Sequence, residues 1–140
     1  MHITQLMSRL PTLVYADETL DAIGHFYQQH RFEFLLVVDR EDRLLGVLNN
    51  HDILNALNVD TEGSRERQQQ LEQLTAEQLL SQPPVLVSRD SSAMAAIGLF
   101  EQQSIACLPV VDHDDRPVGV ITWRDAIFAL GRMLGYRRAA

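Results

Sequence analysis

The sequence predicts an α+β fold made of two similar units, and three observations lead to this prediction. The chain aligns with itself without a gap at a shift of 73 residues, which pairs residues 3–57 with residues 76–130. In each copy, a stretch with apolar residues at helical spacing precedes two short β-branched runs and a second helical stretch. Each copy has only about 55 residues, which is close to the lower size limit for an autonomous core. We therefore expect two pseudosymmetric β-α-β-β-α repeats that pack sheet to sheet as one module.

The elements of the first repeat follow from its residue pattern. Asp17 is expected to cap a helix over ETLDAIGHFYQQH, because Leu20, Ile23 and Phe26 fall on one helical face. The runs FEFLLVVD and LLGVLN are apolar and rich in β-branched residues, and the charged turn Arg40–Arg43 separates them. They predict two antiparallel strands, after which NHDILNAL resumes helical spacing.

The second repeat follows the same order. Asp90 or Ser91 is expected to cap the helical stretch SAMAAIGLFEQQ. The runs CLPVVD and PVGVIT then flank a turn at His113–Arg116 and lead into the helix WRDAIFALGRML.

A polar, Gln-rich connector separates the repeats. It is expected to be helical after about Ser64, and Thr75 with Gln78 forms a capping-box pattern for the next short helix. The predicted organisation is repeat 1 over residues 1–57, the connector over 58–75, repeat 2 over 76–130 and a helical extension over 131–140.

Composition excludes several classes of function. The net charge of −7 and the pI near 5.1 repel nucleic acid and anionic lipid, so we expect no binding to nucleic acid or membrane. Cys107 lies in the apolar run IACLPVV and is expected to be a small buried hydrophobe. The histidines are dispersed and the sequence has no nucleophile motif, so neither a metal site nor catalytic residues are expected. With no leader or spanning segment, we expect a cytoplasmic protein.

The joint between the second strand and the second helix occurs twice, as GVLNNHD at 46–52 and GVITWRD at 119–125. Thr122 followed three residues later by Asp125 is typical of a helix start, where hydroxyl and carboxylate satisfy free backbone N–H groups. The same geometry can bind a ligand, because such a carboxylate can accept hydrogen bonds from the vicinal hydroxyls of a ribose. Arg124 can reach a phosphate with its forked guanidinium. The residues alone leave both interpretations open.

The order of elements, the ending VVD…G-apolar-apolar-(T/S)-x-x-D and the tandem duplication resemble a pair of CBS domains, the Bateman module. The resemblance covers residues 3–57 and 76–130. In that family, two clefts between the repeats often hold adenosine-containing ligands. The resemblance therefore implies a regulatory module, not an enzyme, that binds AMP, ADP, ATP or S-adenosylmethionine and requires no cofactor.

The resemblance also implies two sets of ligand-binding residues. The better-equipped cleft would comprise Ser8, Pro11, Thr12, Leu13, Phe32, Glu33, Phe34, Thr122, Arg124 and Asp125. The second, weaker cleft would comprise Asn49, His51, Asp52, Ser81, Pro84, Val85, Ile105 and Ala106. Asn49 departs from the hydroxyl residue of the family, so the first joint is expected to keep its helix cap while binding ligand less well.

A homodimer is the expected assembly, since modules of this family commonly pair through their helices. The apolar residues Leu130, Met133, Leu134 and Tyr136 lie at or beyond the end of the repeat and are expected to contact a partner. An adenosyl nucleotide and an unidentified protein target are the other expected partners. The alternative function is a ligand-free dimerisation or interaction scaffold, in which both joints act only as helix caps.

Overall fold

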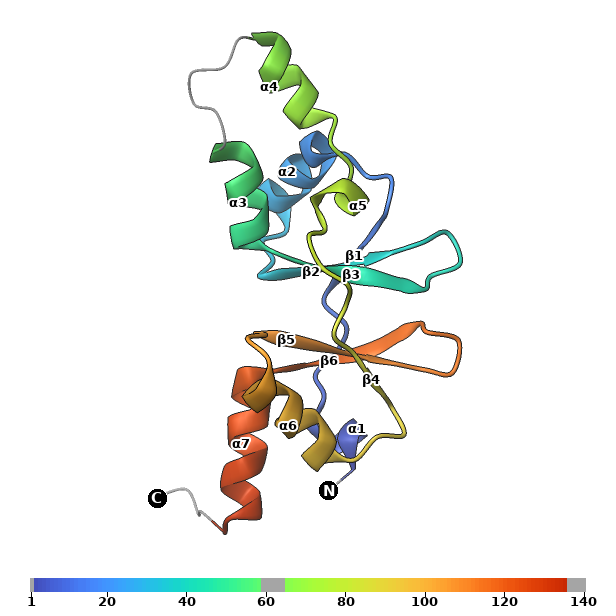
Figure 1. Ribbon diagram of the computed structural model, residues 1–140, viewed down its shortest axis with the longest axis vertical. Coiled ribbons are helices and arrows are strands. Elements are labelled where there is room, and N and C mark those ends of the chain that lie inside the picture. The colour runs from blue at the N-terminus through green and yellow to red at the C-terminus, as the bar shows by residue number, and fades with distance from the viewer. Residues whose placement is uncertain (1, 59–64, 136–140) are drawn as a thin grey trace. The chain divides into compact units, whose positions relative to one another are not determined.

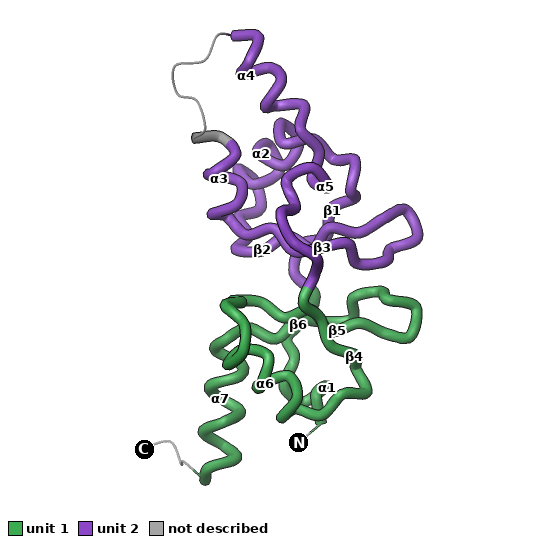
Figure 2. Tube along the Cα trace, viewed as in Figure 1, with its two compact units in different colours: residues 1–10, 85–140 green, residues 11–84 purple. Residues whose placement is uncertain are grey.

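Residues 2–58 and 65–135 are described by the structure, which is a computed structural model (Figure 1). Its contacts divide the chain into two units, shown in Figure 2. Unit 1 comprises residues 1–10 and 85–140, and unit 2 comprises residues 11–84. Each unit is described by itself, and the predicted packing of one sheet on the other stays a prediction.

Unit 2 contains a three-stranded sheet of order β1-β2-β3, with its helices gathered on one face (Figure 1). β1 runs parallel to β2, and β2 runs antiparallel to β3. The elements are β1 (Thr12–Tyr15), α2 (Leu20–Gln29), β2 (Phe34–Val38), β3 (Leu44–Asn49), α3 (Asn50–Asn58), α4 (Arg65–Glu72) and α5 (Ala76–Leu79). The buried core cluster consists of Ile23, Phe32, Leu35, Val37, Leu48 and Ala76.

Unit 1 repeats this architecture with a sheet of order β4-β5-β6 and the same strand directions. The elements are α1 (Ile3–Leu6), β4 (Val87–Ser88), α6 (Ala93–Gln102), β5 (Cys107–Val111), β6 (Pro117–Thr122) and α7 (Trp123–Met133). The buried core cluster consists of Ile3, Leu6, Val87, Ala93, Ala96, Leu108, Val110, Ile121, Ala126 and Ala129. Successive strand residues point to opposite faces, so β5 presents Leu108 and Val110 to this core and apolar neighbours to the other face.

The bounds of the elements confirm the predicted repeat. α2 and α6, β2 and β5, and β3 and β6 begin and end at positions 73 residues apart. The hairpins share their register as well, because Val37 lies opposite Gly46 and Val110 lies opposite Gly119, with an irregularity directly after each pair. The connector is helical from Arg65 as expected, whereas Gly63 and Ser64 fall outside the described residues.

The short segment that leads into each repeat belongs to the unit formed by the other repeat. α1 opens repeat 1, yet Ile3 and Leu6 are buried in the core of unit 1, beside α6 and α7. α5 opens repeat 2, yet its Ala76 is fully buried in the core of unit 2, where α5 packs on β3 and α3. Each unit therefore consists of the body of one repeat and the leading segment of the other.

Gly119 on β6 allows the first leading segment to approach the sheet closely. A Cβ atom at Gly119 would lie 2.7 Å from Sδ of Met7 and 2.9 Å from the carbonyl oxygen of Ser8. Ser8 donates to the carbonyl of Val120 at 2.7 Å and accepts from its N–H at 3.2 Å, which extends the sheet by one bridge. At the equivalent Gly46, the three atoms nearest to an added Cβ all belong to the side chain of Leu80, the closest at 2.6 Å.

The cap of α2 differs from the prediction. Thr19 is the N-cap, and its hydroxyl accepts a hydrogen bond from the N–H of Ala22 at 3.2 Å. The prediction of Asp17 as the cap was wrong, because the Asp17 carboxylate pairs instead with the guanidinium of Arg40 across the loop. This ion pair holds the pKa of Asp17 below its usual value.

The cap of α6 is displaced in the same way. Ser92 accepts a hydrogen bond from the N–H of Ala95 at 3.1 Å, so Asp90 and Ser91 do not cap the helix. Asp90 lies 3.1 Å from Nε2 of His113 instead. The predicted capping box of α5 is confirmed, since the side chains of Thr75 and Gln78 each accept a hydrogen bond from the backbone N–H of the other residue.

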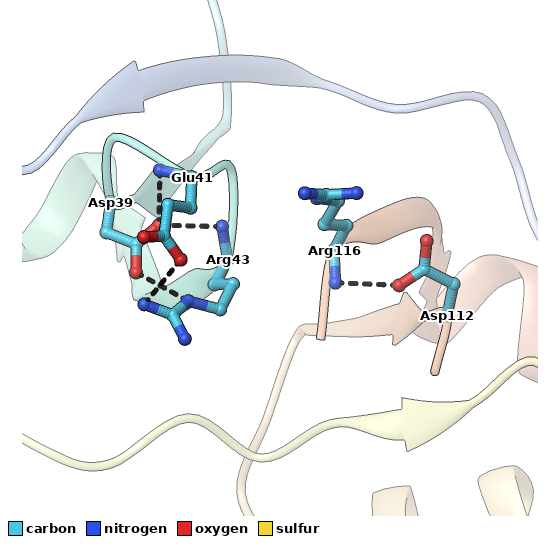
Figure 3. Close-up of polar contacts among 5 residues, drawn as sticks. All are labelled: Asp39, Glu41, Arg43, Asp112 and Arg116. Carbon is cyan, nitrogen blue, oxygen red and sulfur yellow. Dashed lines mark hydrogen bonds and ion pairs between the residues drawn. The ribbon is translucent and has the colours of Figure 1, made fainter. Parts of the chain in front are cut away.

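An aspartate organises each hairpin turn (Figure 3). Asp39 Oδ1 accepts hydrogen bonds from the N–H groups of Glu41 and Arg43, both at 2.9 Å. The bond from the Arg43 N–H is the main reason why the pKa of Asp39 lies below its usual value. Asp42 has a φ of 65°, in the left-handed region that an L-residue adopts at a cost. The turn at Asp112 repeats these contacts in unit 1.

Cys107 is buried, as predicted, with 7% of its surface exposed. Burial, together with the negative charge of Asp125, raises the pKa of its thiol to about 12, so the thiol stays protonated and unreactive near neutral pH. Within residues 2–58 and 65–135, no group of three or more His, Cys, Asp and Glu residues is placed to hold a metal ion. None of the helices described there has the length and apolar character needed to cross a bilayer.

Candidate ligand site at the start of α7

In unit 1, β6 ends at Thr122 and α7 begins at Trp123, so the joint surrounds the N-terminus of an 11-residue helix. The Thr122 hydroxyl accepts a hydrogen bond from the N–H of Asp125 at 3.3 Å, and Oδ2 of Asp125 accepts from the N–H of Thr122 at 2.9 Å. The Thr122 hydroxyl also donates to Oδ2, at 3.0 Å. These contacts confirm the predicted capping box.

Ser8 brings a further donor to the same carboxylate. Its hydroxyl lies 3.1 Å from Oδ2 and 3.3 Å from Oδ1 of Asp125. The backbone bridge between Ser8 and Val120 holds this side chain beside the end of β6. The structure therefore brings together three of the predicted site residues, Ser8, Thr122 and Asp125, in unit 1.

Arg124 is exposed on the first turn of α7. Its guanidinium carbon lies 5.6 Å from the ring centre of Trp123, within the range of a cation–π contact. In the described part of the chain, Arg124 forms no ion pair, so its charge is available to an anion. Trp123 itself is 50% exposed, and its backbone N–H donates to the carbonyl of Ala106 at 3.4 Å.

The joint of unit 2 has the same backbone geometry and different side chains. Oδ1 of Asn49 accepts from the N–H of Asp52 at 2.8 Å, and Oδ2 of Asp52 accepts from the N–H of Asn49 at 3.1 Å. The expectation that Asn49 keeps the cap is confirmed. The exposed His51 stands where unit 1 has arginine. Among the described residues, Ser81 makes no hydrogen bond to Asp52, in contrast to the equivalent serine of unit 1.

The other residues of the predicted main cleft lie in unit 2. Thr12 and Leu13 begin β1, and Phe34 begins β2, where it lies opposite Asn49 in the ladder. Phe32 belongs to the buried core of the unit, and its ring packs on the aromatic residues of α2. Pro11 precedes β1, and Glu33 is exposed between Phe32 and Phe34.

The remaining residues of the predicted second cleft are divided between the units. Ile105 and Ala106 precede β5 in unit 1, and Val85 precedes β4 in the same unit. Ser81 and Pro84 follow α5 in unit 2. The structure thus brings together a polar group at each joint, and the assignment of the other residues to clefts stays a prediction.

The family resemblance placed Ser8 in one cleft with Asp125, but it did not predict the hydrogen bond between them. The signal available was the repeated serine at positions 8 and 81, which carries no information about a bond between residues 117 positions apart. It also missed the role of Gly119, which lets the backbone of Ser8 approach the sheet.

Comparison with known sequences places the chain among CBS proteins. The CBS domain family matches residues 3–59 and 76–132. A CBS domain-containing protein of Dictyostelium discoideum is 26% identical over 134 residues, which are 94% of this chain and 92% of that protein. Inosine-5'-monophosphate dehydrogenase of Mycobacterium leprae is 32% identical over 117 residues, which are 84% of this chain and 20% of the enzyme. The chain thus spans a fifth of that enzyme and about half (53%) of an uncharacterized Methanopyrus kandleri relative.

Solved structures share the fold. The crystal structure of CBSX2 in complex with AMP matches with a TM-score of 0.73 at 20% identity, over 95% of this chain and 98% of that one. The cytosolic domain of the Mg2+ channel MgtE in complex with ATP matches with a TM-score of 0.70 at 22% identity, over 88% of this chain and 46% of that one. With two matching segments that coincide with the two structural repeats, the chain belongs to the CBS domain family.

Proposed function

We propose that this CBS pair is a regulatory module that binds an adenosyl nucleotide at the start of α7. The observation that carries the proposal is the grouping of Asp125, Thr122 and Arg124 around one helix N-terminus. AMP, ADP, ATP and S-adenosylmethionine are the candidate ligands, and the structures of CBSX2 with AMP and of MgtE with ATP support this class. The module acts by binding alone, with no required cofactor and no catalytic step.

Asp125 is the proposed ribose-binding residue. A carboxylate has two oxygens with about four acceptor positions, so it can accept hydrogen bonds from both hydroxyls of a vicinal diol. Its partial burial at the joint strengthens such bonds relative to those of a fully exposed carboxylate. Residues 11–13 and 32–34 remain predicted contributors to adenine binding.

Arg124 and Thr122 are the proposed phosphate-binding residues. The guanidinium of Arg124 is exposed, and the N-terminus of α7 adds the positive end of the helix dipole. The Thr122 hydroxyl has a single hydrogen, which is directed at Asp125 in this structure, so it must rotate before it can donate to a phosphate. Because the cationic group favours an anion, phosphate-bearing nucleotides are preferred over S-adenosylmethionine.

The joint of unit 2 is proposed to bind the same class of ligand more weakly. His51 replaces the arginine there, and an imidazole lacks the forked, permanently charged guanidinium that can bind a phosphate through two parallel hydrogen bonds. The Asn49 amide is committed to the helix cap through its oxygen. Phosphate attraction is therefore weaker at this joint near neutral pH.

Two matched substitutions test this proposal. Asp125→Ala is expected to weaken nucleotide binding tenfold or more, because a charge-assisted hydrogen bond contributes about 1.5–3 kcal/mol. Asp52→Ala removes the equivalent carboxylate from the other joint and is expected to keep most of the affinity. Calorimetric titration of both variants with AMP, ADP, ATP and S-adenosylmethionine measures the difference.

The two variants also control for the cap. Each loses a capping contact of about 1 kcal/mol, so circular dichroism must first show that both are folded. Equal losses of affinity would mean that the joints are equivalent, and a larger loss in Asp52→Ala would place the main site at unit 2. If no nucleotide binds the native chain, the ligand-free scaffold is the better explanation.

Homodimerisation through α7 is the second part of the proposed function. Trp123, Ile127, Leu130 and Leu134 follow one helical face and are 40–66% exposed, with Phe128 beside them at 63%. An exposed apolar face of this kind marks an interaction surface, and Tyr136 of the predicted contact lies outside the described residues.

A charged residue on this face is expected to separate the dimer. Ile127→Glu places a carboxylate on the apolar face and should give a monomer of ~16 kDa by light scattering at micromolar concentration. Leu54→Glu is the control, because Leu54 is the equivalent position of α3 and is 54% exposed. A native chain that is already monomeric would contradict the proposal.

A further inference from the structure

The Asp125 carboxylate is largely occupied by donors of the chain itself. Oδ2 receives three of them, the N–H and hydroxyl of Thr122 at 2.9 and 3.0 Å and the hydroxyl of Ser8 at 3.1 Å. Oδ1 receives only the longer contact from Ser8, at 3.3 Å. A serine hydroxyl has a single hydrogen, so both Ser8 contacts draw on one donor.

A ribose brings two neighbouring hydroxyls, and this structure leaves room for one. One hydroxyl can donate to Oδ1, which holds only the longer Ser8 contact. The second needs Oδ2, where Thr122 and Ser8 already supply more donors than the usual two acceptor positions of one oxygen. The N–H of Thr122 belongs to the helix cap and is retained, whereas the Ser8 hydroxyl lies within reach of both carboxylate oxygens, so it is the group that a diol bound to both oxygens must displace.

We infer that Ser8 is a specificity-determining residue that competes with a vicinal diol for Asp125. The inference rests on the proposed function and assigns to Ser8 a role opposed to the ligand contact expected from the sequence. A diol ligand must displace the Ser8 hydroxyl, whereas a deoxyribose ligand can use Oδ1 and leave Ser8 in place. Ser8 therefore lowers the affinity for ribonucleotides relative to the affinity for deoxyribonucleotides.

The contact is particular to unit 1. Asp52 accepts one hydrogen bond from Asn49, and within the described residues Ser81 supplies none, so the joint of unit 2 has no internal competitor. The cause lies in the leading segments, because the backbone bridge to Val120 positions Ser8, while Ser81 forms no bridge of this kind in the described residues. Ser81 is therefore a matched control for Ser8.

The test compares AMP with 2'-deoxy-AMP by calorimetric titration of the native chain, Ser8→Ala and Ser81→Ala. Ser8 is exposed, so its truncation leaves no buried cavity, and Ser8→Cys serves as a second variant that keeps the size with a weaker donor. In Ser8→Ala, the affinity for AMP should rise about tenfold, while the affinity for 2'-deoxy-AMP rises at most twofold. In Ser8→Cys, the same change should be smaller, and Ser81→Ala should not raise the affinity for AMP relative to that for 2'-deoxy-AMP.

Each outcome separates the inference from the proposed function. If AMP binds the native chain, and the affinity of Ser8→Ala for AMP is the same or lower, the inference is overturned while nucleotide binding stands. An equal gain for both nucleotides also overturns it, because Ser8 would then act through the position of the leading segment and not through the diol. If AMP binds Ser8→Ala and not the native chain, both proposals are supported, and if no variant binds either nucleotide, both fail.

Discussion

Gly119→Ala tests how tightly the first leading segment is held to unit 1. The added Cβ would meet backbone as well as side chain, since it lies 2.9 Å from the carbonyl oxygen of Ser8 and 2.7 Å from Sδ of Met7. The segment must therefore move away from β6. The movement strains or breaks the two backbone hydrogen bonds between Ser8 and Val120, each of about 0.5–1.5 kcal/mol.

The loss should extend into the core. Ile3 and Leu6 of the same segment are buried, and full burial of such a side chain contributes about 1.5–3 kcal/mol. Partial loss of this burial together with the two hydrogen bonds gives an expected decrease of about 2–4 kcal/mol in the free energy of unfolding. Urea denaturation followed by circular dichroism measures this decrease.

Gly46→Ala is the matched control at the equivalent position of unit 2. The three atoms nearest to its Cβ all belong to the Leu80 side chain, with Cδ2 closest at 2.6 Å, and that chain end can rotate away. We expect a decrease of about 1 kcal/mol or less, at the low end of the cost of overpacking. Equal decreases in the two variants would refute the view that close backbone approach at Gly119 holds the segment. Hydrogen exchange of residues 3–8 should also accelerate only in Gly119→Ala.

Three further predictions concern the turns and the leading segments. Asp42→Val should lower the free energy of unfolding by about 1–2 kcal/mol because of the positive φ, while Asp42→Gly should stay within about 0.5 kcal/mol of the native chain, both by urea denaturation. The pKa values of Asp39 and Asp112 are lowered on folding, so the stability that these carboxylates contribute is present above about pH 4 and is lost as the pH falls through their folded pKa values. The free energy of unfolding, measured over a pH series, should therefore fall less steeply with decreasing pH in Asp39→Asn than in the native chain. A chain ending at residue 60 should not unfold cooperatively by calorimetry, because it lacks the buried Ala76 of α5 and leaves Ile3 without the core of unit 1.

Local patterns in the sequence predicted the repeated elements and the joints. The α2 and α6 helices and both hairpins follow from periodicity and from turn residues that act over a few positions. The capping box of Thr122 and Asp125 follows from a spacing of three residues. The error at Asp17 has the same local origin, since Asp17 and Thr19 are both good N-cap residues, and the choice depends on Arg40, which lies 23 positions from Asp17.

The exchange of leading segments could not be predicted from local patterns. α1 and α5 are four residues long, and nothing in such short stretches indicates which core will bury Ile3 or Ala76. The hydrogen bond between Ser8 and Asp125 depends on this exchange, and only the family resemblance, not a local pattern, placed the two residues together. The polar character of the joint could be predicted, whereas the internal competitor for its carboxylate required the structure.

The exchange of leading segments also changes what a break in the chain would do. A cut between residues 58 and 65 gives two fragments, and neither carries a complete unit. The N-terminal fragment supplies α1 to the core of unit 1, and the C-terminal fragment supplies α4 and α5 to unit 2. Each fragment thus completes the other, so the severed chain should reassemble by complementation without a peptide bond between its halves. A single repeat of this kind could complete its core only by exchanging its leading segment with a second copy. The tandem chain is therefore equivalent to a segment-swapped dimer whose two subunits are covalently joined.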